Sequence, residues 1–128
     1  MKSIFFDEIE NTQDYAINEF KDEPLLIVSK AQTAGRGTNK NKWENADQSL
    51  ATSLAFNKEI VNFKKTLVPL LAGYSFVSLH QIEDLKLKWP NDITLNEDKV
   101  GGVLVEENND LICICLLYTS PSPRDGDE

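Results

Sequence analysis

The sequence predicts an α+β domain, built on a mainly mixed or antiparallel sheet with helices packed on one face. Three observations predict this fold class. Short apolar runs typical of strands outnumber helical segments and are concentrated late in the chain. Only two segments carry apolar residues at helical spacing. The strands do not alternate regularly with helices, which argues against a doubly wound nucleotide-binding fold.

The predicted strands are short runs rich in Ile, Leu, Val or Phe, bounded by polar turn residues. Most are too short to form a stable helix. Trp89, at the end of one run, is expected in the core. The runs cover residues 3–9, 25–28, 50–56, 86–89, 93–95, 99–106 and from 111 onward.

Two helices are expected. Asn11 or Thr12 can cap the first, which would end near Phe20, because their side chains accept hydrogen bonds from the first helical turn. The second is predicted over residues 66–83, where apolar residues recur at amphipathic spacing. Pro69 falls in its first turn, where proline is tolerated.

Length and composition indicate one soluble domain. A chain of 128 residues suffices for a single core, and no apolar run approaches the roughly 20 residues that span a bilayer. The net charge of -8 disfavours binding to nucleic-acid phosphates. The N-terminus becomes acidic at Asp7 before any long apolar stretch, which argues against a secretory signal. We expect a cytoplasmic protein whose partners include neither nucleic acid nor membrane.

Cys113 and Cys115 stand two residues apart in an expected strand. Alternate strand residues face the same side, so the two sulfurs are badly placed to bond each other. Neither histidine nor further cysteine lies close in sequence, so a zinc site is not expected. We expect free, buried thiols and assign no protein-held metal ion.

A Gly-Arg-Gly loop follows the second predicted strand. Gly35 and Gly37 flank Arg36, so the backbone can approach an anion while the guanidinium binds carboxylate or phosphate through two parallel hydrogen bonds. Residues 30–42 contain several basic residues and no acid. Trp43 closes the segment as a candidate to pack on adenine. A surface turn with a solvated arginine and a core tryptophan are the alternatives left open.

The most specific segment is the run KWPND at residues 88–92, followed after a turn by KVGG at residues 99–102. Lys99 can place a compact positive charge where an acyl phosphate forms, which is often the largest catalytic contribution. The proline of the first run stiffens the turn that holds Asn91 and Asp92. Alternatives are a solvated strand lysine and an Asx turn.

Together these segments resemble the catalytic domain of biotin protein ligases, in the biotin/lipoate ligase superfamily. The resemblance covers residues 3–112 and implies a class II aminoacyl-tRNA synthetase-like catalytic domain. It implies that biotin and ATP form biotinyl-5′-AMP, which passes biotin to a lysine of the biotin carrier domain of a biotin-dependent carboxylase. ATP, biotin and Mg²⁺ are the implied cofactors.

The resemblance also implies roles for individual residues. Lys99 would hold the biotin carboxylate and the α-phosphate, and Asp92 would position or deprotonate the acceptor lysine. Trp43 would face adenine, and Asn91 would lie near the phosphates and Mg²⁺. The implied catalytic residues are Lys99, Asp92 and Arg36. Those that contact biotin or the adenylate are Thr12, Gln32, Gly35, Arg36, Gly37, Trp43, Asn91, Lys99 and Gly102.

The chain departs from the family pattern in three places. Thr38 and Asn41 stand where the family loop continues with arginine and glycine, and Asn11 replaces the first serine of a Ser-Thr triplet. Further strands, including a Gly-x-Gly-x-Asn segment, are missing. Two alternatives therefore stand beside a biotin protein ligase: a lipoate or octanoate ligase or transferase of the same superfamily, and an inactive truncated fragment that at most binds ligand.

The last residues form a separate prediction. From Cys115 the strand pattern is expected to stop, and residues 115–125 read as a translated sequencing-library adapter. A disordered natural tail is the alternative. We expect residues 1–114 to form a partial catalytic domain and residues 115–128 a non-native or disordered tail. The last natural strand, ending near Ile114, would then be an exposed sheet edge prone to aggregation.

Overall fold

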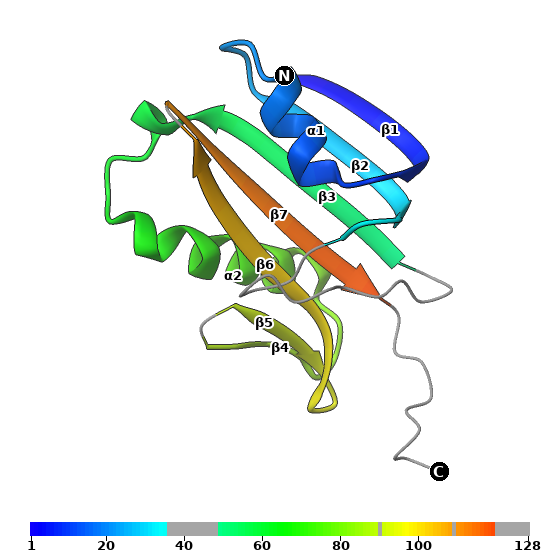
Figure 1. Cartoon of the computed structure of the whole chain (residues 1–128). Coiled ribbons are helices and arrows are strands. Elements are labelled where there is room, and N and C mark those ends of the chain that lie inside the picture. Colours follow the sequence, from blue (N-terminus) through cyan, green and yellow to red (C-terminus); the bar gives the residue numbers. More distant parts are fainter. Residues whose placement is uncertain (36–48, 90, 109, 120–128) are drawn as a thin grey trace.

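The computed structural model describes residues 1–35, 49–89, 91–108 and 110–119 (Figure 1). Within them, a seven-stranded sheet has the order β1-β2-β3-β7-β6-β5-β4 and carries two α-helices. The elements are β1 (Lys2–Ile9), α1 (Thr12–Glu19), β2 (Leu25–Gln32), β3 (Ser49–Asn57), the 3₁₀ turns η2 (Lys58–Ile60) and η3 (Lys65–Leu67), α2 (Val68–His80), β4 (Leu85–Lys88), β5 (Asp92–Leu95), β6 (Asp98–Asn108) and β7 (Leu111–Thr119).

The expected α+β class with a mixed, mainly antiparallel sheet is confirmed. β1 and β2 run parallel, because the helix α1 returns the chain between them to the same end of the sheet. The other neighbouring strands of the described sheet pair antiparallel. β7 is the last strand in sequence and the central one in space, where it pairs with β3 and β6.

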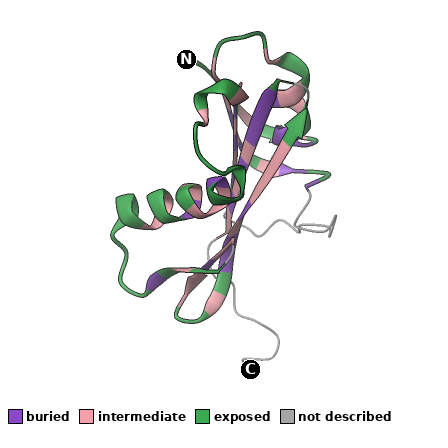
Figure 2. Cartoon of the chain, turned by 90° about the vertical axis from the view of Figure 1, so that its left-hand side faces the viewer, coloured by how far each residue is buried: buried purple, intermediate pink, exposed green. Residues whose placement is uncertain are grey.

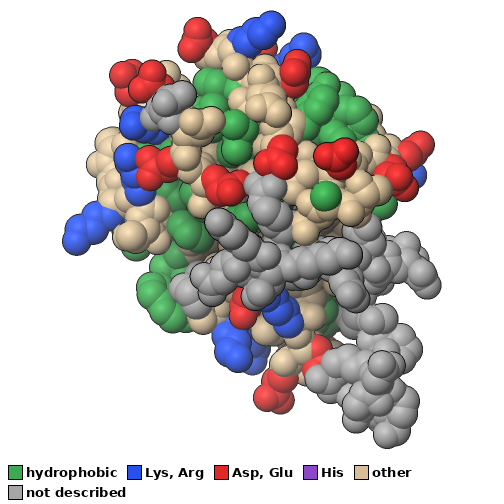
Figure 3. All heavy atoms as spheres, viewed as in Figure 1, with side chains coloured by type: hydrophobic (Ala, Val, Ile, Leu, Met, Phe, Trp, Pro, Cys, Tyr) green, Lys and Arg blue, Asp and Glu red, His purple; other side chains and the backbone are tan. Residues whose placement is uncertain are grey.

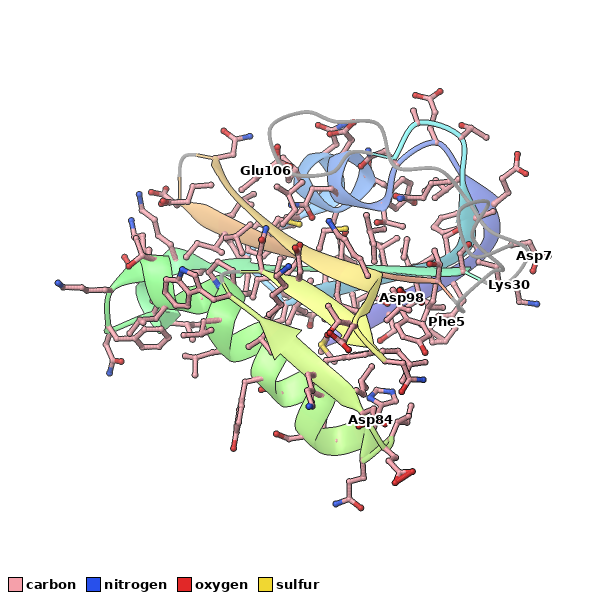
Figure 4. The ribbon with its side chains drawn as sticks, turned by 90° about the horizontal axis from the view of Figure 1, so that it is seen from below. Phe5, Asp7, Lys30, Asp84, Asp98 and Glu106 are labelled. Atoms are coloured by element: carbon pink, nitrogen blue, oxygen red, sulfur yellow. The ribbon has the colours of Figure 1, made fainter. Side chains whose placement is uncertain are left out.

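The two helices lie on opposite faces of the sheet, so the expectation of one covered face is wrong. Adjacent residues of β7 point to different helices: Cys113 packs in the cluster around Ala16 of α1, and Ile114 packs in the cluster that includes Phe76 of α2. Figure 2 shows the sheet almost edge-on, and Figure 4 shows α1 above it and α2 below. Since β7 is apolar on both faces, each face needs its own cover.

Polar side chains hold the start of α1 in place. The Asn11 cap is confirmed: its Oδ1 accepts from the Asp14 N–H at 3.0 Å, and its Nδ2 donates to the Ala34 carbonyl at 2.8 Å. Gln13, only 2% exposed, donates from Nε2 to the Cys113 carbonyl at 3.0 Å. The Cys113 thiol donates to Oε1 of Gln13, also at 3.0 Å. The first turn is thereby tied to β7.

The second helix is shorter than the predicted 66–83. Residues 65–67 form η3, and Gln81 ends α2 in the left-handed region at φ 47°. Pro69 lies in the first turn, as expected. The helix is apolar on most sides, and its outer side leaves Leu79 80% exposed. No helix in the described parts of the chain is long and apolar enough to cross a membrane.

Strand structure does not stop at Ile114. β7 continues to Thr119, with register pairs to β3 and β6, and both Cys115 and Leu117 are buried. The alternation that buries Cys113 simply continues along the strand. β7 is also not a sheet edge, so that expectation is wrong too. The non-native origin of residues 115–128 stays a prediction.

Two smaller predictions were tested by the described residues. Cys113 and Cys115 are buried thiols that form no disulfide within the described residues, as expected. Trp89 was expected in the core and is 71% exposed. It follows the last residue of β4, the edge strand, and lies beyond the final ladder pair between Lys88 and Asp92.

Substitution of Gly101 should destabilise the fold. A Cβ at this position would lie 2.5 Å from the backbone carbonyl oxygen of Leu117, so β6 and β7 would have to move apart. Gly101→Ala should lower the free energy of unfolding by roughly 2 kcal/mol, in the range of other overpacked sites. Gly102→Ala is the matched control, because its Cβ would meet nothing closer than 3.6 Å. Urea unfolding of both variants tests this, and equal stabilities would contradict it.

The Cys113 thiol should make stability fall at alkaline pH. Burial, then the nearby charges of Cys115, Glu106 and Asp14, raises the pKa of Cys113 well above its usual range. The unfolded chain releases this proton near pH 8.5, whereas the folded chain retains it, so the stabilisation is complete below that pH. Above it, stability should fall by about 1.4 kcal/mol per pH unit.

Chemical unfolding of wild type and Cys113→Ala between pH 7 and 10 measures this dependence. The variant should be less stable at pH 7 because it loses packing, but its stability should fall less steeply above about pH 8.5. Parallel pH profiles for the two proteins would contradict the prediction.

Candidate active site

The structure brings most of the predicted site residues to one face of the sheet, the face that carries α1. They form two groups there, one at the start of α1 and one on the β5–β6 hairpin. Three predicted positions, Arg36, Gly37 and Trp43, lie outside the described residues, as does Pro90.

The first group is a buried polar cluster of Thr12, Gln32 and Ser53. Oε1 of Gln32 accepts from the Thr12 backbone N–H at 2.7 Å and lies 3.1 Å from the Thr12 hydroxyl. The Thr12 and Ser53 hydroxyl oxygens are 2.8 Å apart. Thr12 and Ser53 are fully buried and Gln32 is 4% exposed. Burial of three polar side chains costs free energy unless they form hydrogen bonds with one another or with a ligand.

Ser53 was not among the predicted site residues. It lies on β3 between Ala51 and Ala55, which face the same side of the strand and are also buried. A row of small side chains on one strand face was the available signal, because it indicates that something approaches the sheet closely there. The register of β3 against β7 places Ser53 opposite Cys115, whose Sγ is 3.9 Å from the Thr12 hydroxyl.

The start of the Gly-Arg-Gly segment lies close to this cluster. The backbone N–H groups of Thr33 and Ala34 donate to the carbonyls of Ile9 and Glu10 at 3.0 and 2.8 Å. These bonds tie the end of β2 to the turn before α1, and Gly35 is buried beside them. Gly35 therefore lies next to the first turn of α1, and its contact with biotin or the adenylate stays a prediction.

One of the basic residues of segment 30–42, Lys30, lies away from the polar cluster. Lys30 forms an ion pair with Asp7, with 3.6 Å between Nζ and Oδ1, and both side chains are largely exposed. Figure 4 shows the two labelled residues together at the edge of the molecule. An exposed pair of this kind contributes little to stability and leaves Lys30 outside the polar cluster.

The second group is held by the β5–β6 hairpin. The Asn91 side-chain Nδ2 donates to the Val103 carbonyl at 3.0 Å, and the Val103 N–H donates to the Asn91 carbonyl at 2.9 Å. Nζ of Lys99 lies 3.1 Å from Oδ1 of Asp92. A register shift between Ile93 and Thr94 brings Lys99 onto the same face as Gly102.

Gly102 keeps the backbone of β6 uncovered at this point. A Cβ there would point toward Lys99, whose Cε would be 3.9 Å away, and toward the Asn91 carbonyl. The space above Gly102 is thus bordered by a cation and by backbone. The role of Gly102 as backbone beside a ligand stays a prediction.

An apolar cluster separates the two groups. Register pairs Gly102 with Leu117 and Leu104 with Cys115, so these residues share the α1 face with the polar cluster. Leu104 packs against the buried Ala51, Cys115 and Leu117. Along β6, Leu104 and Gly102 are about 6.8 Å apart, the rise of two strand residues. Across this face of the sheet, the buried polar cluster is therefore followed by the apolar cluster and then by Lys99.

Lys99 supplies positive charge to a protein of net charge -8. Figure 3 views the α1 face and shows acidic side chains spread over and around α1. The Lys99 and Asp92 side chains are 51% and 30% exposed, so their pairing is weak and an anionic ligand can compete for Lys99. No group of three His, Cys, Asp or Glu side chains suited to a metal ion occurs in the described part of the chain.

Sequence comparison identifies the family to which this geometry belongs. A sequence model of the Biotin/lipoate A/B protein ligase family matches residues 5–118. Biotin--protein ligase 2 of Arabidopsis thaliana is 33% identical over 110 residues, which cover 75% of this chain and 32% of that protein. The bifunctional ligase/repressor BirA of Bacillus subtilis is 32% identical over 110 residues, covering 80% and 34%. The chain spans about a third of the length of these curated relatives.

Solved structures give the same answer. The biotin acetyl coenzyme A carboxylase synthetase of Helicobacter pylori, with bound biotinylated ATP, has a TM-score of 0.85 and 32% identity, covering 94% of this chain and 62% of that one. Biotin protein ligase of Aquifex aeolicus, in complex with biotin and ATP, has a TM-score of 0.81 and 26% identity, covering 98% and 56%. The chain belongs to the biotin/lipoate A/B protein ligase family.

Proposed function

We propose that the protein binds biotin and ATP and acts as a biotin protein ligase. It forms biotinyl-5′-AMP and transfers biotin to a lysine of the biotin carrier domain of a carboxylase. The named relatives support the reaction class, since one is called biotin--[acetyl-CoA-carboxylase] ligase, from Paracoccus denitrificans. The chain spans only part of the length of its relatives, so the activity of the whole protein is part of the proposal.

One observation carries the choice of biotin: the order of chemistry along the α1 face. Biotin has a ureido ring with N–H donors and a carbonyl acceptor, then an alkyl chain, then a carboxylate. The buried cluster of Thr12, Gln32 and Ser53 suits the ureido ring. The apolar cluster around Leu104 suits the alkyl chain, and Lys99 suits the carboxylate.

Lipoate fits the same face less well. Its carboxylate and alkyl chain could take the same places, but its dithiolane ring forms no strong hydrogen bond with the polar cluster. A site built to bond a polar ligand discriminates strongly against an analogue that leaves its buried groups unpaired. The lipoate complex of P. falciparum LipL1 has 13% identity and a TM-score of 0.60, a likeness of fold alone.

Lys99 stabilises the first step in this proposal. A carboxylate oxygen of biotin bonds to the α-phosphorus of ATP while the bond to the pyrophosphate leaving group breaks. Negative charge gathers where the carboxylate meets the α-phosphate, and a fixed ammonium there favours the transition state. Mg²⁺ enters with the substrate MgATP, because in such sites it is commonly bound by the substrate phosphates and water together with only one or two protein carboxylates.

Asp92 acts in the second step. The amine of the carrier lysine attacks the acyl carbon of biotinyl-5′-AMP, AMP leaves, and the amine loses a proton. Asp92 stands beside Lys99, where it can orient the incoming ammonium and accept that proton. We place the reaction in the cytoplasm, with the carrier domain as the protein partner and with no nucleic-acid or membrane partner, as the charge and the N-terminal sequence led us to expect.

The 128-residue chain should bind biotin in preference to lipoate. The loss of the ureido contacts should weaken lipoate binding by at least tenfold, the effect of one or two buried hydrogen bonds. Isothermal titration with each acid, with and without a non-hydrolysable ATP analogue, measures the difference. Tighter binding of lipoate would contradict biotin as the substrate.

Lys99→Ala should reduce biotin-dependent exchange of pyrophosphate into ATP by on the order of a hundredfold, the usual effect of removing one preorganised charge contact. Lys86→Ala is the matched control. Lys86 is an exposed residue of the edge strand β4, on the far side of β5 from Lys99, and its loss should leave exchange unchanged. Near-normal exchange in Lys99→Ala would overturn the role of Lys99. Biotin binding without any exchange in the wild type would instead indicate a ligand-binding fragment.

A further inference from the structure

We infer that Ser53 is a positioning residue: its hydroxyl donates a hydrogen bond to Thr12 and thereby sets which donors and acceptors the polar cluster offers to a ligand. The inference deepens the proposed function, because it concerns the same site. Ser53 acts through Thr12, with their hydroxyl oxygens 2.8 Å apart. Both residues are fully buried, so the contact lies beneath the protein surface.

The direction of the amide group of Gln32 comes first. The Thr12 backbone N–H can only donate, and its partner lies 2.7 Å away on Gln32. That partner must be the oxygen Oε1, since the amide nitrogen has no acceptor lone pair to offer. The amide orientation is therefore fixed by the backbone, and Nε2 of Gln32 is turned away from the Thr12 N–H.

The direction of the Thr12 hydroxyl follows. Its oxygen lies 3.1 Å from Oε1 of Gln32, and Oε1 carries no hydrogen, so only the Thr12 hydroxyl can donate across this contact. A hydroxyl has one hydrogen. Thr12 consequently cannot also donate to Ser53, and the 2.8 Å contact must be a bond donated by Ser53.

The three residues thus form a chain of hydrogen bonds with one polarity, from Ser53 to Thr12 to Gln32. Each bond strengthens the next by polarising it. By the same reasoning the Cys115 thiol, 3.9 Å from Thr12 Oγ1, can only donate to it, and an N–H of the ligand would replace this weak S–H bond. The Gln32 amide nitrogen is turned away from Thr12. A ureido ring, which has both N–H groups and a carbonyl, is complementary to this polarity.

Ser53→Ala in the 128-residue chain tests the inference. The affinity for biotin, measured by isothermal titration, should fall about tenfold, because the variant leaves a buried lone pair of Thr12 without its donor. If the wild type catalyses the reaction, Ser53→Ala should raise KM for biotin by the same factor. It should leave kcat and KM for ATP unchanged. Ser53→Thr keeps the hydroxyl and should restore most of the affinity.

Ser29→Ala is the matched control. Ser29 is also fully buried, on the neighbouring strand β2, but among the described residues its hydroxyl bonds to the backbone of Ala31, at 2.7 and 3.3 Å, and not to Thr12. The same substitution there should leave biotin affinity unchanged. If Ser29→Ala lowers the affinity as much as Ser53→Ala does, the loss reflects general softening of the core and the inference is overturned.

A double-mutant cycle with Thr12→Val separates action through Thr12 from direct contact with the ligand. If Ser53 acts through Thr12, Ser53→Ala should cause no further loss once Thr12→Val is present. Additive losses would overturn the positioning role. Should Ser53→Ala fail to fold, Ser53→Cys retains the volume and supplies only a weak S–H donor, so its affinity should fall in the same direction.

A measurement without ligand keeps the inference distinct from the proposed function. In NMR spectra of the ligand-free chain, the Thr12 hydroxyl proton should be protected from exchange, and it should move upfield in Ser53→Ala but not in Ser29→Ala. If the wild type binds no biotin but the Thr12 proton still moves upfield in Ser53→Ala, only the proposed function is overturned. An unmoved Thr12 proton in Ser53→Ala would overturn the role of Ser53, whatever the ligand.

Discussion

The pairing of β7 with β3 on one side and β6 on the other joins the two halves of this domain, and the rest of the structure depends on it. Its alternating side chains serve two cores at once: Cys113 and Leu117 face the α1 side, while Ile114 and Leu116 face the α2 side. A strand that is apolar on both faces is stable only between two covering layers. The two helices therefore take opposite faces, and the early strands meet the late ones across the centre of the sheet.

The candidate site arises where these two halves meet on the α1 face. The first turn of α1 is held against β7 by the reciprocal bonds of Gln13 and Cys113, which bring Thr12 over the sheet. The β5–β6 hairpin brings Lys99 from the other side. The distance between the groups is set by strand geometry, since β3 and β6 lie on either side of β7 in one sheet. Rigid strands and a short capped helix place this chemistry more firmly than loops would.

The proposed function requires an acidic protein to attract anionic ligands. Its net charge of -8 repels phosphates at long range, but attraction at short range depends on local charge. Lys99, on the sheet surface beside Gly102, provides that local charge, and its exposed pairing with Asp92 is readily exchanged. At the other end, buried hydroxyl and amide groups act through direction instead of charge, which is where selectivity for a polar ring would come from.

Local sequence signals determined much of this protein. The Asn11 cap, the Pro69 first turn, the short apolar runs and the hairpin that carries Asn91, Asp92 and Lys99 could all be predicted, because propensity, capping and turn chemistry act over a few residues. The site residues Thr12, Gln32, Gly35 and Gly102 were predicted through the family resemblance of their motifs. Thr12, Gln32 and Gly35 lie at the start of α1, and Gly102 lies beside Lys99 on β6.

Tertiary structure alone decided the remainder. Which face each helix covers, the central place of β7 and its extension through Cys115 and Leu117 depend on pairing with strands distant in sequence. Trp89 is exposed because its strand lies at the sheet edge. Ser53 entered the site only because β3 passes beneath Thr12, a contact between residues 41 positions apart. Periodicity in a sequence reveals that a side chain has a buried face, but the partner on that face is set by long-range packing.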